Sequence, residues 1–196
     1  MEVENGEDPR AYLVKSGKFL PDFNGGLNMQ FKYKAFTLYA LFNIQWGGHG
    51  RLPKLYDTSS NYGIPTPEQN VSRDIIGRWR KPGDNTLIPS IPTSLAYIQL
   101  PSTGSVESSE SWLYDMYNNS DVRVAKTDFI RCNSLSLAYD FDERFLSKIH
   151  AKRLQLKFTL ANPFLWVSDS KWNGIDPETG NWPARRMATM SLKVMF

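Results

Sequence analysis

The chain has 196 residues, of which 41% are hydrophobic and 22% charged, and its formal net charge is +3. This balance excludes a disordered polyelectrolyte, and the scattered lysines and arginines exclude the concentrated basic surface that binds nucleic acid. A single cysteine excludes an intramolecular disulfide, and no apolar run is long enough for a transmembrane helix.

Alternation of apolar and polar residues first predicts two strands, at 26–34 and 36–47. In the first strand the apolar positions run from Leu27 to Tyr33, and in the second from Phe36 to Trp46. Because only about two residues join these strands, we expect a tight hairpin.

The next segment, 49–120, is rich in Pro, Ser, Asn and Gly and shows no sustained period. Short helical turns are expected near 69–79 and 112–117. A stretch of this length without regular structure is unusual in a compact soluble domain, but it is ordinary for an extracellular loop of a barrel.

Three further strands are predicted at 122–141, 152–166 and 184–196, with a helical turn near 143–148. In the first of them one face carries Phe129, Leu135, Leu137, Tyr139 and Phe141, interrupted by Arg131 and Asn133, and the other face carries Cys132, Ser134, Ser136, Ala138 and Asp140. The apolar positions of the last two strands are Leu154, Leu156, Phe158 and Leu160, and then Met190, Leu192, Val194 and Phe196.

The connections alternate between long and short along the chain, and aromatic residues lie near strand ends. If Phe196 ends in the periplasm, every long connection falls outside the cell and every short one in the periplasm, as in outer-membrane barrels. The prediction is therefore an all-β, antiparallel up-and-down meander of about five strands, part of a large transmembrane β-barrel with long extracellular loops. Its lipid-facing residues include Leu154, Leu156, Phe158 and Leu160, and the aromatic girdles include Phe36, Trp46, Phe141, Phe164 and Trp166.

No nucleophile elbow, phosphate loop or zinc spacing is present, so the sequence does not predict an enzyme or a cofactor. Three groups have a chemical interpretation beside a structural one, which is favoured in each case. They are Cys132 with His49 or His150 as a nucleophile pair or a plain strand cysteine, Asp140, Asp142 and Glu143 as an acid–base pair or a charged turn, and Asp176, Glu178 and Asn181 as a Ca²⁺ site or a Pro/Gly turn. The loops also contain aromatic residues for which three roles are open: stacking on a sugar, sealing against a partner, or packing within the loop. They are Trp79, Trp112, Tyr114 and Trp172, and no substrate contact is assigned to them.

Several segments resemble the C-terminal part of SusC/RagA-type TonB-dependent outer-membrane transporters of Bacteroidota. They are P-D-F-N-G-G-L-N-M-Q-F-K-Y-K-A-F-T-L at 21–38, R-W-R-K-P-G-D at 78–84, D-F-I-R-C-N-S-L-S-L-A-Y at 128–139, G-I-D-P-E at 174–178 and the terminal strand to Phe196. Arg185–Arg186–Met187 departs from the family, which has a Pro-Arg-Thr-like run there.

The resemblance implies an outer-membrane importer of oligosaccharides or peptides, driven by TonB through a plug that is missing here. It also implies a SusD-like surface lipoprotein as partner, and a C-terminal signal for the barrel-assembly machinery at Met190, Leu192, Val194 and Phe196. Five strands cannot close a barrel, so we expect a truncated fragment, inactive alone, with 1–24 as an extracellular loop remnant, 25–47 as the hairpin, 48–121 as the long extracellular loop and 122–196 as the last three strands. The alternative is a soluble β-sandwich that binds carbohydrate, which predicts two packed sheets. The substrate stays unidentified.

Overall fold

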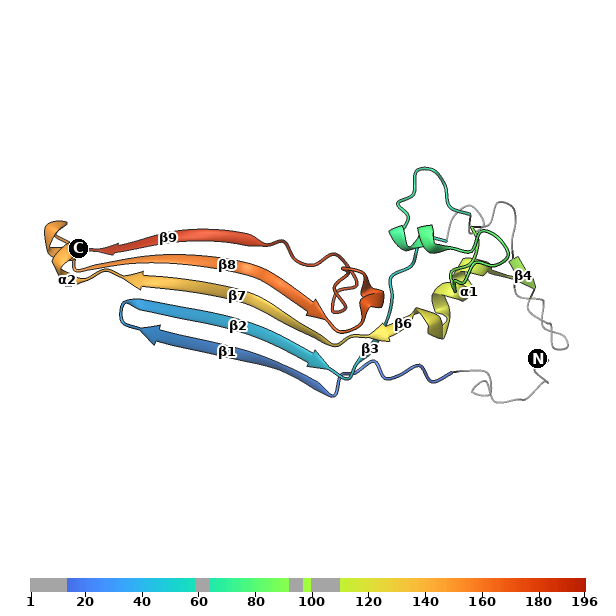
Figure 1. Cartoon of the computed structure of the whole chain (residues 1–196), viewed down its shortest axis with the longest axis horizontal. Coiled ribbons are helices and arrows are strands. Elements are labelled where there is room, and N and C mark those ends of the chain that lie inside the picture. The colour runs from blue at the N-terminus through green and yellow to red at the C-terminus, as the bar shows by residue number, and fades with distance from the viewer. Residues whose placement is uncertain (1–13, 59–63, 92–96, 100–109) are drawn as a thin grey trace. The chain divides into compact units, whose positions relative to one another are not determined.

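The computed structural model describes residues 14–58, 64–91, 97–99 and 110–196. The chain divides into two compact units (Figure 1). Lys18–Gly50 and Ala125–Phe196 form the first, named here the sheet unit, and Arg51–Val124 with residues 14–17 forms the second, the loop unit. The chain passes from one unit to the other at three points, and the short strands β3 (His49–Arg51) and β6 (Val124–Lys126) contain the second and third of them.

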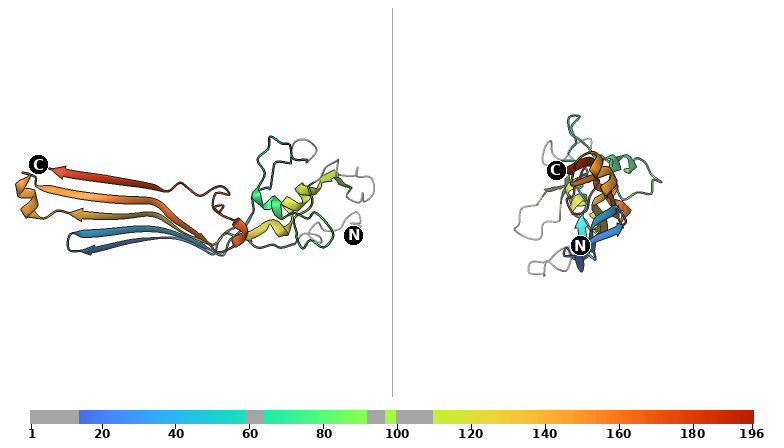
Figure 2. Two further views of the ribbon diagram at one scale, coloured as in Figure 1. Left: turned by 45° about the horizontal axis from the view of Figure 1, so that its top comes forward. Right: turned by 90° about the vertical axis from the view of Figure 1, so that its left-hand side faces the viewer.

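Five long strands make up the sheet unit: β1 (Phe23–Tyr33), β2 (Phe36–Trp46), β7 (Phe129–Asp140), β8 (Arg153–Val167) and β9 (Met187–Met195). Their order in the sheet is β1-β2-β7-β8-β9, and every neighbouring pair is antiparallel. The predicted up-and-down meander is thereby confirmed. Figure 2 shows one layer of strands, and the described part of the sheet unit has no second sheet packed face to face, which a β-sandwich requires.

Short helices lie at the connections of the sheet unit. Helix α2 (Glu143–Lys148) joins β7 to β8, and η5 (Ser170–Trp172) begins the connection from β8 to β9. The Asp142 side chain starts α2 by accepting a hydrogen bond from Phe145 N, as an N-cap residue does. No helix in the described ranges is both long and apolar enough to cross a membrane.

The loop unit has its own small core, whereas the sequence predicted only short helical turns in a segment without a sustained period. It contains η3 (Arg73–Gly77), β4 (Tyr97–Gln99), β5 (Glu110–Trp112), α1 (Leu113–Asn119) and η4 (Asp121–Arg123). Leu55, Tyr56, Ile75 and Tyr114 are buried together, and Ile88, Ile91 and Tyr117 pack against them. These side chains are not periodic in sequence, so a search for periodicity cannot find the core they form. Helical turns near 69–79, 112–117 and 143–148 are confirmed.

A β-bulge in β7 and β8 corrects the predicted faces of the third strand. Ser134 pairs with Ala161, but Cys132 pairs with Phe164, so one residue of β7 and two of β8 lie between these pairs. The extra residue reverses the alternation, and Cys132 therefore shares a face with Leu135, while Arg131 lies on the opposite face. The predicted placement of Phe129 with Leu135 and of Cys132 with Ser134 was wrong.

The local sequence of β8 explains why the irregularity lies there. Asn162 has a φ of 50°, which asparagine tolerates better than most residues. Pro163 follows, and proline within a sheet is confined to edges and bulges because it has no N–H to donate. Two other strands begin later than predicted. Strand β7 begins at Phe129 instead of 122, and β9 begins at Met187 instead of 184.

Candidate functional site

One face of the five-stranded sheet is apolar from edge to edge. The pairing register places residues of all five strands in common rows, and three successive rows on this face contain almost only apolar side chains. These rows are Tyr33–Phe36–Tyr139–Leu156–Leu192, Phe31–Leu38–Leu137–Phe158–Met190 and Met29–Ala40–Leu135–Leu160–Ala188. We call this surface the apolar face.

The opposite surface, the polar face, carries hydroxyl, amide and charged side chains at the intervening positions. Its rows include Lys32–Thr37–Ala138–Lys157–Ser191 and Gln30–Tyr39–Ser136–Thr159–Thr189. The Lys157 ammonium lies 5.7 Å from the centre of the Tyr39 ring, so neighbouring rows of this face also contact one another.

The apolar face is open to its surroundings along its whole width. Phe31 is 62% exposed at one edge, Phe158 45% in the middle and Met190 73% at the other edge. A contiguous apolar surface of this extent is rare on a soluble monomer and marks a surface that contacts a membrane or another protein.

The length of the strands fits a membrane. Strand β2 has 11 residues, which span about 36 Å at roughly 3.3 Å per residue. A tilt of about 40° reduces this height to about 28 Å, close to the apolar band of about 25 Å in outer-membrane barrels. Exposed aromatic side chains mark both limits, with Phe36 at one end of the strands and Trp46, Phe164 and Trp166 at the other.

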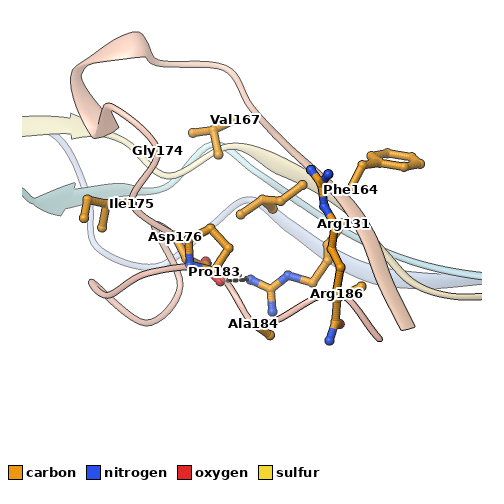
Figure 3. Close-up of a pocket in the computed structure, with 11 residues that line it drawn as sticks. Arg131, Phe164, Val167, Gly174, Ile175, Asp176, Pro183, Ala184 and Arg186 are labelled. Carbon is orange, nitrogen blue, oxygen red and sulfur yellow. Dashed lines mark hydrogen bonds and ion pairs between the residues drawn. The ribbon is translucent and has the colours of Figure 1, made fainter. Parts of the chain in front are cut away.

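A pocket of about 150 Å³ lies between the end of β8 and the connection to β9. Figure 3 shows the Arg131 side chain directed at Asp176 within it, with Arg186 nearby. Pro183 and Ala184 line another wall, with Leu165 and Val167 from β8. The pocket therefore has an apolar lining around a group of charged side chains.

The charges of this pocket are largely satisfied inside it. Arg131 Nη2 donates to both carboxylate oxygens of Asp176, at 2.8 and 2.6 Å, and Arg131 Nη1 lies 2.8 Å from Glu178 Oε2. Its guanidinium also stacks 5.0 Å from the ring centre of Phe129, which is fully buried. Because the Asp176 side chain is only 3% exposed, this ion pair is shielded from solvent.

The same contacts decide between the two interpretations of residues 176–181. Asp176 and Glu178 face a guanidinium rather than an open cation site, and Asp176 Oδ1 also accepts from Glu178 N at 3.0 Å. Gly180 N donates to Asp176 O at 2.8 Å, and Gly180 has a φ of 68°, which a glycine adopts readily. The segment is a turn that holds Arg131, and the Ca²⁺ interpretation fails.

The other two groups with a chemical interpretation also have structural roles. Asp140 accepts hydrogen bonds from Arg153 at 3.2 Å and Gln155 at 3.0 Å, and Asp142 caps α2. The buried Cys132 thiol contacts Ser134 O at 3.7 Å. These carboxylates and this thiol hold the fold.

The loop aromatics divide between core and surface. Tyr114 is 1% exposed and donates its hydroxyl to Pro89 O at 2.6 Å, and burial raises its pKa to about 12. Trp172 is also buried and donates from Nε1 to Lys126 O at 2.7 Å. Trp79 is 40% exposed, and the Trp112 side chain lies outside the described part.

The residues predicted to face lipid all lie on the apolar face, as do three of the four assembly-signal residues. Leu156, Leu160, Met190 and Leu192 are in the three rows, and Leu154 pairs with Val194 one row beyond them. Leu154 is 7% exposed while Phe158 is 45% exposed, and Phe196 follows β9 at 76% exposure. Sequence reasoning missed the Arg131–Asp176 pair, although a charged residue interrupting an apolar face was a visible signal.

Two curated proteins that are similar to this chain are both TonB-dependent receptors. The chain is 30% identical over 169 residues to TonB-dependent receptor P39 of Formosa agariphila, and 24% identical over 210 residues to TonB-dependent receptor P3 of the same organism. These matches cover 84% and 98% of this chain but 14% and 18% of the two receptors. The chain thus spans less than a fifth of the curated relatives it matches. No family model matches it.

Solved structures give the same fold. The RagAB peptide importer in its open-open state superposes with a TM-score of 0.59 at 16% identity, over 91% of this chain and 17% of that chain. The closed-closed state gives 0.58 at 15% identity, over 89% and 17%. At these identities the likeness establishes the arrangement of the strands.

Proposed function

This chain belongs to the TonB-dependent receptor family, and we propose that it is the C-terminal β-barrel segment of a SusC/RagA-type outer-membrane importer of oligosaccharides or peptides. The continuous apolar face carries this proposal. In an outer-membrane barrel, lipid-facing and lumen-facing residues alternate, and all backbone groups pair between neighbouring strands.

In this proposal the apolar face contacts lipid and the polar face lines the lumen. Leu156, Phe158 and Leu160 of β8 face the membrane because they belong to the apolar face. Leu154 continues this face by one row, with a side chain that is largely covered by protein. Lys157 and Thr159 face the lumen from the same strand, where water and substrate replace lipid.

The connections set the orientation. The β1–β2 turn and α2 connect strands at one end of the sheet, and residues 47–128 and 168–186 connect them at the other. We assign the first end to the periplasm and the second to the cell exterior, since outer-membrane barrels have short periplasmic turns. In this proposal β1 and β2 form the hairpin, residues 47–128 the long extracellular loop, and β7, β8 and β9 the last three strands. Residues before β1 belong to another extracellular loop.

The partners follow from this assignment. Met190, Leu192, Val194 and Phe196 form the terminal signal for the barrel-assembly machinery, at the periplasmic end of β9. We assign a SusD-like surface lipoprotein as the extracellular partner. The similar RagAB peptide importer, whose name joins two proteins, supports this by analogy. Energy comes from TonB through a plug, which belongs to the remainder of a complete receptor.

Spin labels on β9 of the complete receptor test the membrane assignment. Met190→Cys and Ser191→Cys are compared in a Cys132→Ser background, because these neighbours lie on opposite faces. After reconstitution in phospholipid vesicles, the label at 190 should be accessible to oxygen and shielded from a water-soluble nickel reagent. The label at 191 should show the reverse, and equal behaviour at both positions would reject the assignment.

The substrate class needs a separate measurement. Cells that express the complete receptor and its surface partner are given labelled peptides or labelled oligosaccharides, with and without active TonB. TonB-dependent accumulation of one class assigns the substrate, whereas accumulation of neither class would contradict the proposed import.

A further inference from the structure

Helix α2 continues the apolar face beyond the end of the strands. Ring contacts form a chain from Phe36 to Tyr139 at 4.8 Å, from Tyr139 to Phe141 at 4.9 Å and from Phe141 to Phe145 at 5.1 Å. Phe36 and Tyr139 belong to a row of the apolar face. The helix therefore contacts the outward side of the sheet, beside the C-terminal end of the chain (Figure 1).

The helix has two distinct sides. At 100° per residue, Phe145, Leu146 and Ile149 fall within one arc, and Arg144 and Lys148 lie four residues apart on the arc beside it. Leu146 is 9% exposed and anchors α2, whereas Phe145 and Ile149 remain 43% and 39% exposed. An apolar arc next to a pair of basic residues is the pattern of a helix that lies in a membrane interface.

The basic side chains of α2 are not paired with the neighbouring carboxylates. Asp140 accepts from Arg153 and Gln155, and Asp142 caps the helix. Among the described residues Arg144, Lys148 and Lys152 form no ion pair, which leaves Glu143 as the acidic side chain on the helix itself. The Arg144 guanidinium and the Lys148 ammonium are therefore available to an anionic ligand.

We propose that α2 lies in the periplasmic interface of the outer membrane and binds the phosphate headgroup of an anionic phospholipid through Arg144 and Lys148. Phe145 and Ile149 enter the acyl region, and the two basic side chains extend back to the headgroup level. This inference rests on the proposed function, because it requires the apolar face to contact lipid. It adds a lipid site at a position where an outer-membrane barrel needs only a turn.

The depth of the helix is the first test. In the complete receptor with Cys132→Ser, spin labels are placed at Met190, at Ile149 and at Ser147, which lies away from the apolar arc. The expected order of depth is the label at 190 in the acyl region, the label at 149 at the interface and the label at 147 in water.

Binding of phosphatidylglycerol is the second test, measured by native mass spectrometry of the same receptor. Arg144→Gln with Lys148→Gln should weaken this binding about 30-fold, since each basic side chain near an anionic surface contributes roughly fivefold in affinity. Lys157→Gln with Lys193→Gln is the matched control, because it removes the same charge from the polar face and should leave the binding unchanged.

These outcomes distinguish failure of the lipid site from failure of the proposed importer function. A label at 190 in lipid with a label at 149 in water overturns the lipid site and leaves the importer proposal intact. So does an unchanged affinity in the Arg144/Lys148 double variant, or an equal loss in the control. A label at 190 in water overturns both.

Discussion

Arg131 joins two parts of the sheet unit at one end of the sheet. It neutralises the buried Asp176 and stacks on the buried ring of Phe129, so it joins the 168–186 connection to β7. Removing one partner of a buried ion pair leaves an uncompensated charge, which costs about 3 kcal/mol.

We therefore predict that Arg131→Gln lowers the free energy of opening of segment 168–186 by about 3 kcal/mol. Amide hydrogen exchange of that segment in the complete receptor should accelerate roughly 100-fold, because each 1.4 kcal/mol changes an equilibrium about tenfold. Exchange measured by mass spectrometry gives the result directly.

Arg153→Gln is the control at the other end of the sheet. Its pair with Asp140 is more open, with side chains 53% and 32% exposed, so solvent screens the charges. Its loss should cost less than about 1 kcal/mol. Equal effects of the two substitutions on their own segments would show that burial of Asp176 does not matter.

At the scale of the elements, the period of each strand was predictable and its interruptions were not. Alternation located all five long strands, because each presents one face to an apolar and one to a polar environment. Alternation assigned the wrong faces beyond the bulge at Asn133 and Asn162, because a β-bulge inserts an extra residue that the residue types of the strand do not reveal. The charged Arg131 on an expected apolar face was the sign that the alternation reverses nearby.

The two faces of β8 give a prediction at this scale. Phe158→Lys in the complete barrel should lower the free energy of unfolding by roughly 2–4 kcal/mol, the cost of a lysine near the bilayer midplane. Lys157→Gln, one residue away on the polar face, should cost well under about 1 kcal/mol for its contact with Tyr39. Urea unfolding in vesicles measures both, and similar losses would mean that the faces are assigned wrongly.

The loop unit gives a prediction about pH. Burial raises the pKa of Tyr114 to about 12, and burial also raises that of Tyr56, beside it at a ring distance of 4.9 Å. An unfolded tyrosine ionises near pH 10. The neutral hydroxyls therefore contribute stability that is complete below pH 10 and is lost as the pH rises toward 12.

We expect the 51–124 segment to become sensitive to proteinase K between pH 10 and 12 while the sheet stays resistant. Tyr114→Phe should weaken the unit at pH 8, because Pro89 O loses its 2.6 Å hydrogen bond, and should reduce the pH effect. Cleavage that begins in both units at the same pH would contradict this account.

For the whole molecule, the number of strands governs what the chain can assemble. Five strands with antiparallel neighbours leave β1 and β9 running in the same direction at the two edges of the sheet. Joining β1 to β9 of the same copy therefore requires a parallel seam. Bacterial outer-membrane barrels are antiparallel with an even number of strands, so closure needs an odd number of further strands.

Consequently we predict that the 196-residue chain, exported alone, forms no stable barrel. Each backbone group left unpaired in lipid costs several kcal/mol, and the outer edges of β1 and β9 present such groups along 11 and 9 residues. On semi-native gels the chain should run as an unfolded or aggregated species and be digested by trypsin, while the complete receptor shows a heat-sensitive folded band. A folded, trypsin-resistant band from the chain alone would mean that its edges do pair, and the parallel seam would then be the first contact to examine by cross-linking cysteines placed on β1 and β9.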